Sequence, residues 1–196
     1  AAFYNRTNPQ RSKWNNIGLT ISSLYMIFTI VNKTRINTIF ENSLIKENIT
    51  YQRYLTTPTI LNNILWSGIA ESDSVYYYGT YSFFDAEKSF KLTVLPKNRA
   101  VVGDAINKDQ TLKTLTWFSD DYYQIKRKNQ DSLEYYDLRF GTFKMKSTDA
   151  EQFVFKFNIQ EKPKGTFILK DQGDRPRDAD FGEAFAALWN RIMGRT

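Results

Sequence analysis

The chain of 196 residues contains no cysteine and no histidine. Without cysteine it has no disulfide bond, thiolate metal site, iron–sulfur cluster or cysteine nucleophile. Without histidine it has no Ser-His-Asp triad, no histidine general base and no histidine-ligated zinc or iron. The sequence therefore excludes the commonest hydrolytic chemistries from these residues.

Glycine and proline are also sparse, at 9 and 5 residues, so we expect no long linker and no low-complexity segment. Aromatic residues, in contrast, make up 16% of the chain, which favours a packed core with β-structure. A chain of this length can bury a core without disulfide bonds. We therefore expect a single domain over residues 1–196.

Basic residues exceed acidic ones, 27 to 21, for a net charge of +6. This excess would suit an anionic lipid surface or nucleic acid, although a soluble basic domain is the simpler interpretation. The basic run 126–128 could join nearby tyrosines in a surface that stacks bases, and these are Tyr122, Tyr123, Tyr135 and Tyr136. No known nucleic-acid-binding motif accompanies them, so we expect an exposed hairpin tip and no nucleic-acid partner.

A long helix is predicted over residues 8–48, because Asn8 and Pro9 form a start signal and no proline follows. Apolar residues recur at helical spacing, at Trp14, Ile17, Ile21, Leu24 and Phe28. Residues 14–32 carry no charge and approach the length of a membrane span, yet several Asn, Ser and Thr residues interrupt them. Both a packed soluble helix and a helix in contact with lipid fit this pattern.

Residues 50–170 predict a mostly antiparallel sheet built from hairpins. A strand over 60–70, with Trp66 near its middle, and a second over 75–84 flank the turn at 71–74. Further strands are predicted at 89–95, 122–128, 133–140, 153–160 and, as an edge strand, 166–170. A short helix is predicted at 108–118. An amphipathic helix at 178–194 has one apolar face and closes the fold, which gives an α+β class; that face comprises Phe181, Phe185, Leu188, Trp189 and Ile192.

Acidic residues near the turns are candidate ligands for Mg²⁺ or Mn²⁺, which carboxylate oxygens can bind without histidine. A carboxylate-only hydrolase site would use some grouping of Asp73, Asp85, Asp120, Asp121 and Asp137. The adjacent pair at 120–121 points apart on an extended chain, and Ser and Asp are ordinary turn residues, so turns without metal are the simpler interpretation.

Asp137 and Arg139 lie on the same face of a predicted strand. Their side chains can form an ion pair or face a ligand together, because a guanidinium group binds anions through two parallel hydrogen bonds. Both a structural pair and an anion-recognising Arg139 fit the spacing. The serines and lysines of the chain also permit a lysine-activated serine, but no serine is singled out.

Five segments in the same order resemble a known family. They are Trp14–Tyr25, Thr56–Trp66, Tyr77–Asp85, Leu115–Ser119 with Tyr122–Tyr123, and Asp137–Gly141. Over residues 5–194 the chain resembles the C-terminal part of bacterial inner-membrane-bound metal-dependent hydrolases, also described as LexA-binding, inner-membrane-associated hydrolases.

The resemblance implies a parent protein with an N-terminal multi-helix membrane region that carries the histidine- and aspartate-containing metal motifs. It therefore implies a divalent metal in the parent but no cofactor in this chain. The chain would be an accessory domain at the surface of the bacterial inner membrane that binds or positions substrate, with the membrane as its main partner. The sequence specifies no oligomeric state. The candidate substrate-binding residues are Arg139, Asp137, Tyr78, Tyr81, Asp85 and Trp66.

Overall fold

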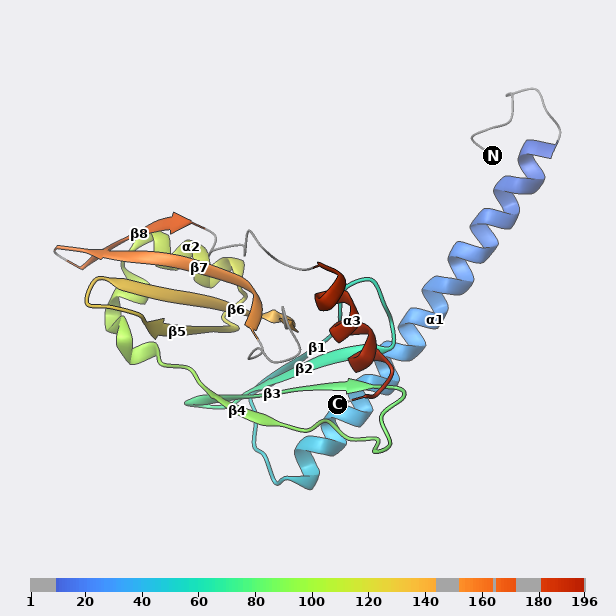
Figure 1. Ribbon diagram of the computed structural model, residues 1–196, viewed down its shortest axis with the longest axis horizontal. Coiled ribbons are helices and arrows are strands. Elements are labelled where there is room, and N and C mark those ends of the chain that lie inside the picture. Colours follow the sequence, from blue (N-terminus) through green and yellow to red (C-terminus); the bar gives the residue numbers. More distant parts are fainter. Residues whose placement is uncertain (1–9, 144–151, 164, 172–180, 196) are drawn as a thin grey trace. The chain divides into compact units, whose positions relative to one another are not determined.

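The computed structural model describes residues 10–143, 152–163, 165–171 and 181–195. The chain falls into two compact units, residues 1–38 and 39–196. Helix α1 (Gln10–Lys46) begins in the first unit and ends in the second, and two four-stranded sheets, a mid-chain helix and a C-terminal helix follow it (Figure 1). The α+β class predicted from the sequence is confirmed.

Helix α1 has 37 residues and agrees with the prediction of a helix over 8–48. The proposed start signal at Asn8 and Pro9 lies outside the described residues. The helix ends where Asn48 takes a left-handed conformation with φ of 55°. Hydrogen bonds from the Asn48 and Ile49 amides to the carbonyls of Ile45 and Leu44 satisfy the last turn.

The first sheet has the order β1-β2-β3-β4, all antiparallel, with strands β1 (Arg53–Pro58), β2 (Leu65–Glu71), β3 (Val75–Ser82) and β4 (Thr93–Pro96). The predicted hairpin across 71–74 is present. Strand β2 begins at Leu65 rather than at residue 60, because residues 59–64 form a turn. Strand β1 was not predicted: Pro58 resembled a break, yet it is the last residue of an edge strand, where no N–H is needed.

The second sheet has the order β5-β6-β7-β8 and is also antiparallel, with strands β5 (Tyr123–Arg127), β6 (Ser132–Phe143), β7 (Gln152–Lys162) and β8 (Thr166–Asp171). The predictions of these strands and of α2 (Gln110–Phe118) are confirmed. The antiparallel structure predicted over residues 50–170 is divided into two sheets. Pro96 and the left-handed Asn98 end β4, and two 3₁₀ turns (Arg99–Val101 and Gly103–Asn107) then lead into α2.

Aromatic side chains fill the interior of the second unit. One buried cluster packs α2 against the second sheet and includes Leu112, Tyr123, Tyr135 and Phe157. Another cluster contains side chains of both sheets, among them Tyr76, Tyr78, Tyr122 and Leu138. The two sheets therefore share part of one core, as the high aromatic content led us to expect.

Helix α3 (Phe181–Ile192) corresponds to the predicted helix at 178–194, of which residues 178–180 lie outside the described part of the chain. Its predicted apolar face is only partly packed. Ile192 is buried, whereas Phe185 and Trp189 are 62% and 52% exposed. Gly194, with φ of 71°, follows the helix as expected.

Candidate functional site

Asp137 and Arg139 of β6 form the ion pair that their spacing allows. The Arg139 guanidinium donates to the Asp137 carboxylate through Nη2 at 2.7 Å and through Nε at 3.1 Å. The Asp137 side chain is fully buried, whereas that of Arg139 is 21% exposed. The hydrogen bond to Asp137 and its charge raise the pKa of Arg139 above its ordinary value, although burial opposes this.

Arg139 also contacts the C-terminal end of α2. Its Nη2 donates to the Phe118 carbonyl, and its guanidinium lies over the rings of Phe118 and Phe140, 5.5 and 5.1 Å from their centroids. Contacts of this kind favour a cation near a ring face. Arg139 therefore joins β6 to α2 and keeps a partly exposed edge among aromatic rings.

Next to Arg139, an irregularity in β6 brings together three of the five segments that carry the family resemblance. The pairing of β6 with β7 shifts between Asp137 and Thr142, and Gly141 has a φ of 77°. The Thr57 hydroxyl donates to the Arg139 carbonyl at 2.9 Å, and the Tyr78 and Thr142 hydroxyls lie 3.1 Å apart. Segments 56–66, 77–85 and 137–141 thus meet at this bulge, although they are distant in sequence.

The turn after α2 places two aspartates in left-handed conformations, with φ of 50° at Asp120 and 61° at Asp121. Asp and Asn tolerate this region better than other side chains do. Two arginines donate hydrogen bonds to the carbonyls of this turn. Arg53 donates to Asp120 O at 2.8 Å, and Arg99 donates to Asp121 O at 3.4 Å. Positive groups are favourable here, because the C-terminal end of a helix carries partial negative charge.

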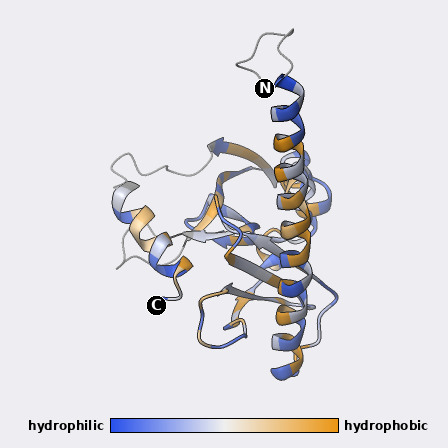
Figure 2. Cartoon of the chain, turned by 90° about the vertical axis from the view of Figure 1, so that its right-hand side faces the viewer, coloured by the Kyte–Doolittle hydropathy of each residue, from blue (hydrophilic) through white to orange (hydrophobic). Residues whose placement is uncertain are grey.

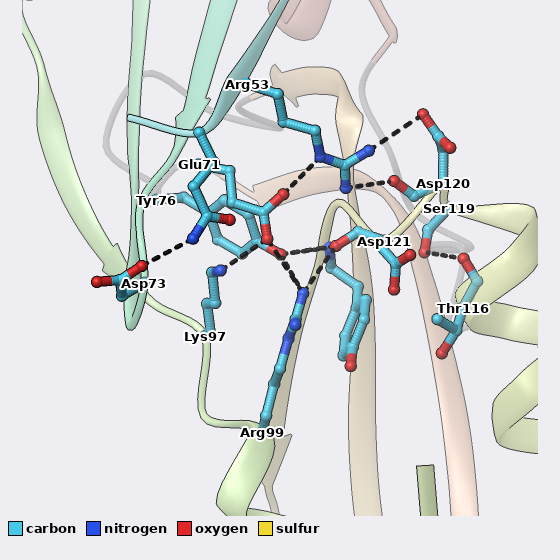
Figure 3. Close-up of polar contacts among 12 residues, drawn as sticks. Arg53, Glu71, Asp73, Tyr76, Lys97, Arg99, Thr116, Ser119, Asp120 and Asp121 are labelled. Carbon is cyan, nitrogen blue, oxygen red and sulfur yellow. Dashed lines mark hydrogen bonds and ion pairs between the residues drawn. The ribbon is translucent and has the colours of Figure 1, made fainter. Parts of the chain in front are cut away.

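Glu71 lies at the centre of these cations (Figure 3). Its carboxylate, 6% exposed, accepts from Lys97 Nζ and Arg53 Nε, each at 2.6 Å, and from Arg99 Nη2 at 3.3 Å. Burial alone would raise the pKa of Glu71. The hydrogen bonds and charges of Lys97 and Arg53 outweigh it, so the pKa lies below its ordinary value and the group is a carboxylate at neutral pH.

Tyrosine rings contact two of the cations in this cluster. The Arg53 guanidinium lies 4.2 Å from the centroid of the Tyr122 ring, and that of Arg99 lies 5.0 Å from the centroid of Tyr123. The Tyr76 hydroxyl donates to Asp121 O at 2.7 Å. Burial raises the pKa of Tyr76 to about 12, so its hydroxyl stays protonated and remains a donor at neutral pH.

Most of this cluster could not be recognised from the sequence. Glu71 was interpreted as a turn residue or as a ligand of a divalent cation, and nothing singled out Arg53, Lys97 or Arg99. One signal was accessible: Arg53 stands opposite Glu71 in the β1–β2 register, but only once β1 is recognised as a strand. The convergence of Lys97 and Arg99 on Glu71 depends on tertiary packing and has no sequence spacing that reveals it.

The remaining candidate substrate-binding residues come from the first sheet and the segment that follows it. Trp66 and Tyr81 are each 2% exposed, and Tyr78 is 6% exposed. Asp85 forms an ion pair with Arg191 of α3, at 2.7 Å. Of the six candidates, Asp137, Arg139 and Tyr78 therefore come together around the bulge, whereas the other three belong to the first sheet and its contact with α3.

The five candidate metal-binding carboxylates do not gather at one place. Asp73 accepts a hydrogen bond from Gln52 at 2.7 Å, and Asp85 and Asp137 pair with arginines. Within the described ranges no group of three or more acidic side chains could hold a metal ion.

The basic run is exposed, as expected for a hairpin tip, and Arg127 pairs with Glu161 at 2.9 Å. The alternative interpretation, an aromatic stacking surface beside it, is not supported. Tyr122 and Tyr123 are each 2% exposed and Tyr135 is 0% exposed, because these rings pack in the core. The Tyr123 and Tyr135 rings stack on each other instead, with centroids 4.9 Å apart.

Comparison with known protein families, with curated proteins and with solved structures gives no match for this chain. The resemblance to inner-membrane-bound hydrolases therefore stays a prediction that depends on the five segments quoted above.

Proposed function

We propose that this chain is a membrane-anchored accessory domain. Residues 14–32 of α1 would lie in a bilayer, and the unit of residues 39–196 would bind or position the substrate of a hydrolase whose metal site lies outside these residues. The resemblance suggests the bacterial inner membrane as the location. The observation that carries the proposal is that the uncharged stretch of α1, residues 14–32, is mostly exposed.

Apolar residues recur along most of the length of α1 (Figure 2). Tyr25, Met26, Ile27 and Phe28 follow one another around the helix, and each is between 53% and 59% exposed. A helix that is apolar on all sides is typical of a protein core or a membrane span. The 18-residue apolar window of α1 has none of its residues buried, which favours lipid over a core.

Basic residues flank the uncharged stretch, with Arg11 and Lys13 before it and Lys33 and Arg35 after it. Such residues are common at the ends of membrane helices, where they reach the headgroups. The apolar stretch from Trp14 to Asn32 has the length that a bilayer core requires of a helix.

The geometry around Arg139 supports a role in positioning. The buried Asp137 carboxylate fixes the orientation of the Arg139 guanidinium, which also lies over the rings of Phe118 and Phe140. An anionic or aromatic group of a substrate suits this combination of cation and ring faces. We assign this edge the recognition of substrate and leave the bond-breaking step to the parent protein.

Flotation of the full chain with phosphatidylcholine vesicles tests the anchor. We expect the wild-type chain to float and the double variant Leu24→Lys/Ile27→Lys to remain largely in solution, because each lysine at the centre of a span costs about 3 kcal/mol. Trp117→Lys is the control, since Trp117 is 81% exposed on α2 and outside the anchor. A wild-type chain that stays in solution, or a double variant that floats equally well, would contradict the proposal.

A further inference from the structure

The turn between β1 and β2 presents two large apolar side chains to solvent. Leu61 is 97% exposed and Ile60 is 58% exposed. The Leu61 side chain contributes almost no burial to the fold. Exposed apolar residues are common singly, but an almost wholly exposed leucine beside an exposed isoleucine at a loop tip is a candidate contact site.

The backbone holds Leu61 in an unfavourable conformation. Its φ is +59°, a left-handed value that glycine and asparagine adopt readily and that a leucine adopts only at a cost. Folding therefore gains neither burial nor backbone relaxation from a leucine at this position. Strain of this kind persists where the surrounding structure imposes it and is concentrated at functional segments.

The next residue, Asn62, imposes the geometry. Its carboxamide oxygen accepts from the amides of Ile64 and Leu65, at 2.9 and 2.7 Å. Its carboxamide nitrogen donates to the Thr59 hydroxyl at 2.8 Å and to the Ile60 carbonyl at 3.1 Å. The tip is thus a fixed platform for Ile60 and Leu61 rather than a loose loop, and it needs little ordering on contact.

The turn itself carries no charge. No charged residue occurs in the sequence between Arg53 and Glu71. Phe84, which is 54% exposed, belongs to the segment after β3, whose Phe83 amide donates to the Ile64 carbonyl at 3.2 Å. Asp85, next to Phe84, is paired with Arg191 at 2.7 Å. The turn at 59–64 itself therefore offers apolar groups and neutral polar groups, the composition that suits the headgroup boundary of a bilayer.

We propose that Ile60 and Leu61 insert into the surface of a lipid bilayer as a second, shallow contact in addition to the α1 anchor. The inference depends on the proposed function, since the anchor would hold the chain at a bilayer. A bilayer fits this uncharged tip better than a protein partner does, because two apolar side chains form a far smaller patch than the interface of about 1,600 Å² that a stable protein complex buries.

Site-specific labelling tests this inference cleanly, because the chain has no cysteine. A polarity-sensitive fluorophore is attached to Leu61→Cys in the full chain, which is bound to phosphatidylcholine vesicles with and without spin-labelled lipid. Val94→Cys is the matched control, since Val94 is an apolar residue of the same sheet, 56% exposed, on the opposite edge strand β4. We expect a blue shift and quenching by the spin-labelled lipid at position 61 and neither at position 94.

Two results would overturn the inference while flotation shows the anchor intact. One is a water-like spectrum at position 61 that matches position 94, and the other is a blue shift that spin-labelled lipid does not quench, which indicates a protein contact. Loss of flotation itself would count against the proposed function instead.

The variant Leu61→Asn supplies a second measurement. We expect its melting temperature to equal or exceed that of the wild type, because asparagine tolerates the left-handed backbone. A clearly lower melting temperature would show that Leu61 serves folding and would overturn the inference.

Discussion

At the scale of single residues, the cations around Glu71 are the most consequential arrangement in the second unit. Lys97 and Glu71 are both almost fully buried, each with a side chain 6% exposed. A buried ion pair adds little net stability over an apolar pair, but the loss of one partner leaves an uncompensated charge in the interior. Glu71 is therefore a residue whose removal is costly even though its presence is nearly neutral.

The variant Glu71→Ala is expected to lower the free energy of unfolding by about 3 kcal/mol, because Lys97 would remain buried without a carboxylate. Asp104→Ala provides the control, since Asp104 is 91% exposed and pairs only with Lys108 on the surface. That variant should change stability by less than about 0.5 kcal/mol. Urea denaturation measures both values, and equal losses would contradict the central role of Glu71.

We also expect the lowered pKa of Glu71 to make the stability of the protein depend on pH. Because the pKa of Glu71 lies below its ordinary value of 4.5, the unfolded chain takes up a proton at higher pH than the folded protein does. The stabilising contribution is thus complete above that value and is lost as the pH falls below it. Thermal melting at pH values around and below 4.5 measures this effect. As the pH falls, the melting temperature of Glu71→Gln should decrease less than that of the wild type.

At the scale of elements, one glycine determines how closely the C-terminal part of α1 approaches the first sheet. A Cβ atom added at Gly68 of β2 would lie 2.5 Å from Cε2 of Phe40, a fully buried ring. The absence of a side chain lets this ring lie directly on the strand. The contact explains why Gly68 stands in the interior of a central strand, where glycine is otherwise unfavourable.

The variant Gly68→Ala should therefore cost about 1–3 kcal/mol through overpacking. Phe40→Leu removes the ring edge and should itself cost about 1.5 kcal/mol or less. In the double variant the added methyl group occupies space that the ring has left, so the combined loss should be smaller than the sum of the two. Denaturant unfolding of the four proteins measures this coupling, and strictly additive losses would rule out the direct contact.

At the scale of the whole molecule, two features could attach the chain to a membrane. The net charge of +6 would attract an anionic surface, and the uncharged stretch of α1 would insert into hydrocarbon. These mechanisms respond differently to salt, because screening weakens attraction between exposed charges and leaves apolar burial intact. The proposed anchor requires the second mechanism.

We expect flotation with neutral phosphatidylcholine vesicles to persist when the salt concentration is raised from about 0.1 M to about 1 M. Anionic lipid should add an increment that salt removes. If flotation required anionic lipid and vanished at high salt, the alternative of an anionic-lipid-binding surface would replace the proposed anchor.

Local patterns accounted for most elements. The helix over 8–48 followed from a stretch without proline, and the strands over 122–170 followed from alternation between short turns. Strand β1 was missed because Pro58 is harmless only at a sheet edge, and the position of a strand within a sheet is not a local property. The division into two sheets escaped prediction for the same reason, since strand pairing joins residues distant in sequence.

The sequence by itself determined the α+β class, the uncharged stretch of α1 and the spacing that lets Asp137 meet Arg139, because each depends on neighbouring residues. Only the tertiary structure decided that Lys97 and Arg99 converge on Glu71, that the tyrosines at 122, 123 and 135 are buried, and that Leu61 is exposed in a strained turn. These properties arise from contacts between segments that are distant in sequence, and such contacts cannot be inferred from a local sequence pattern.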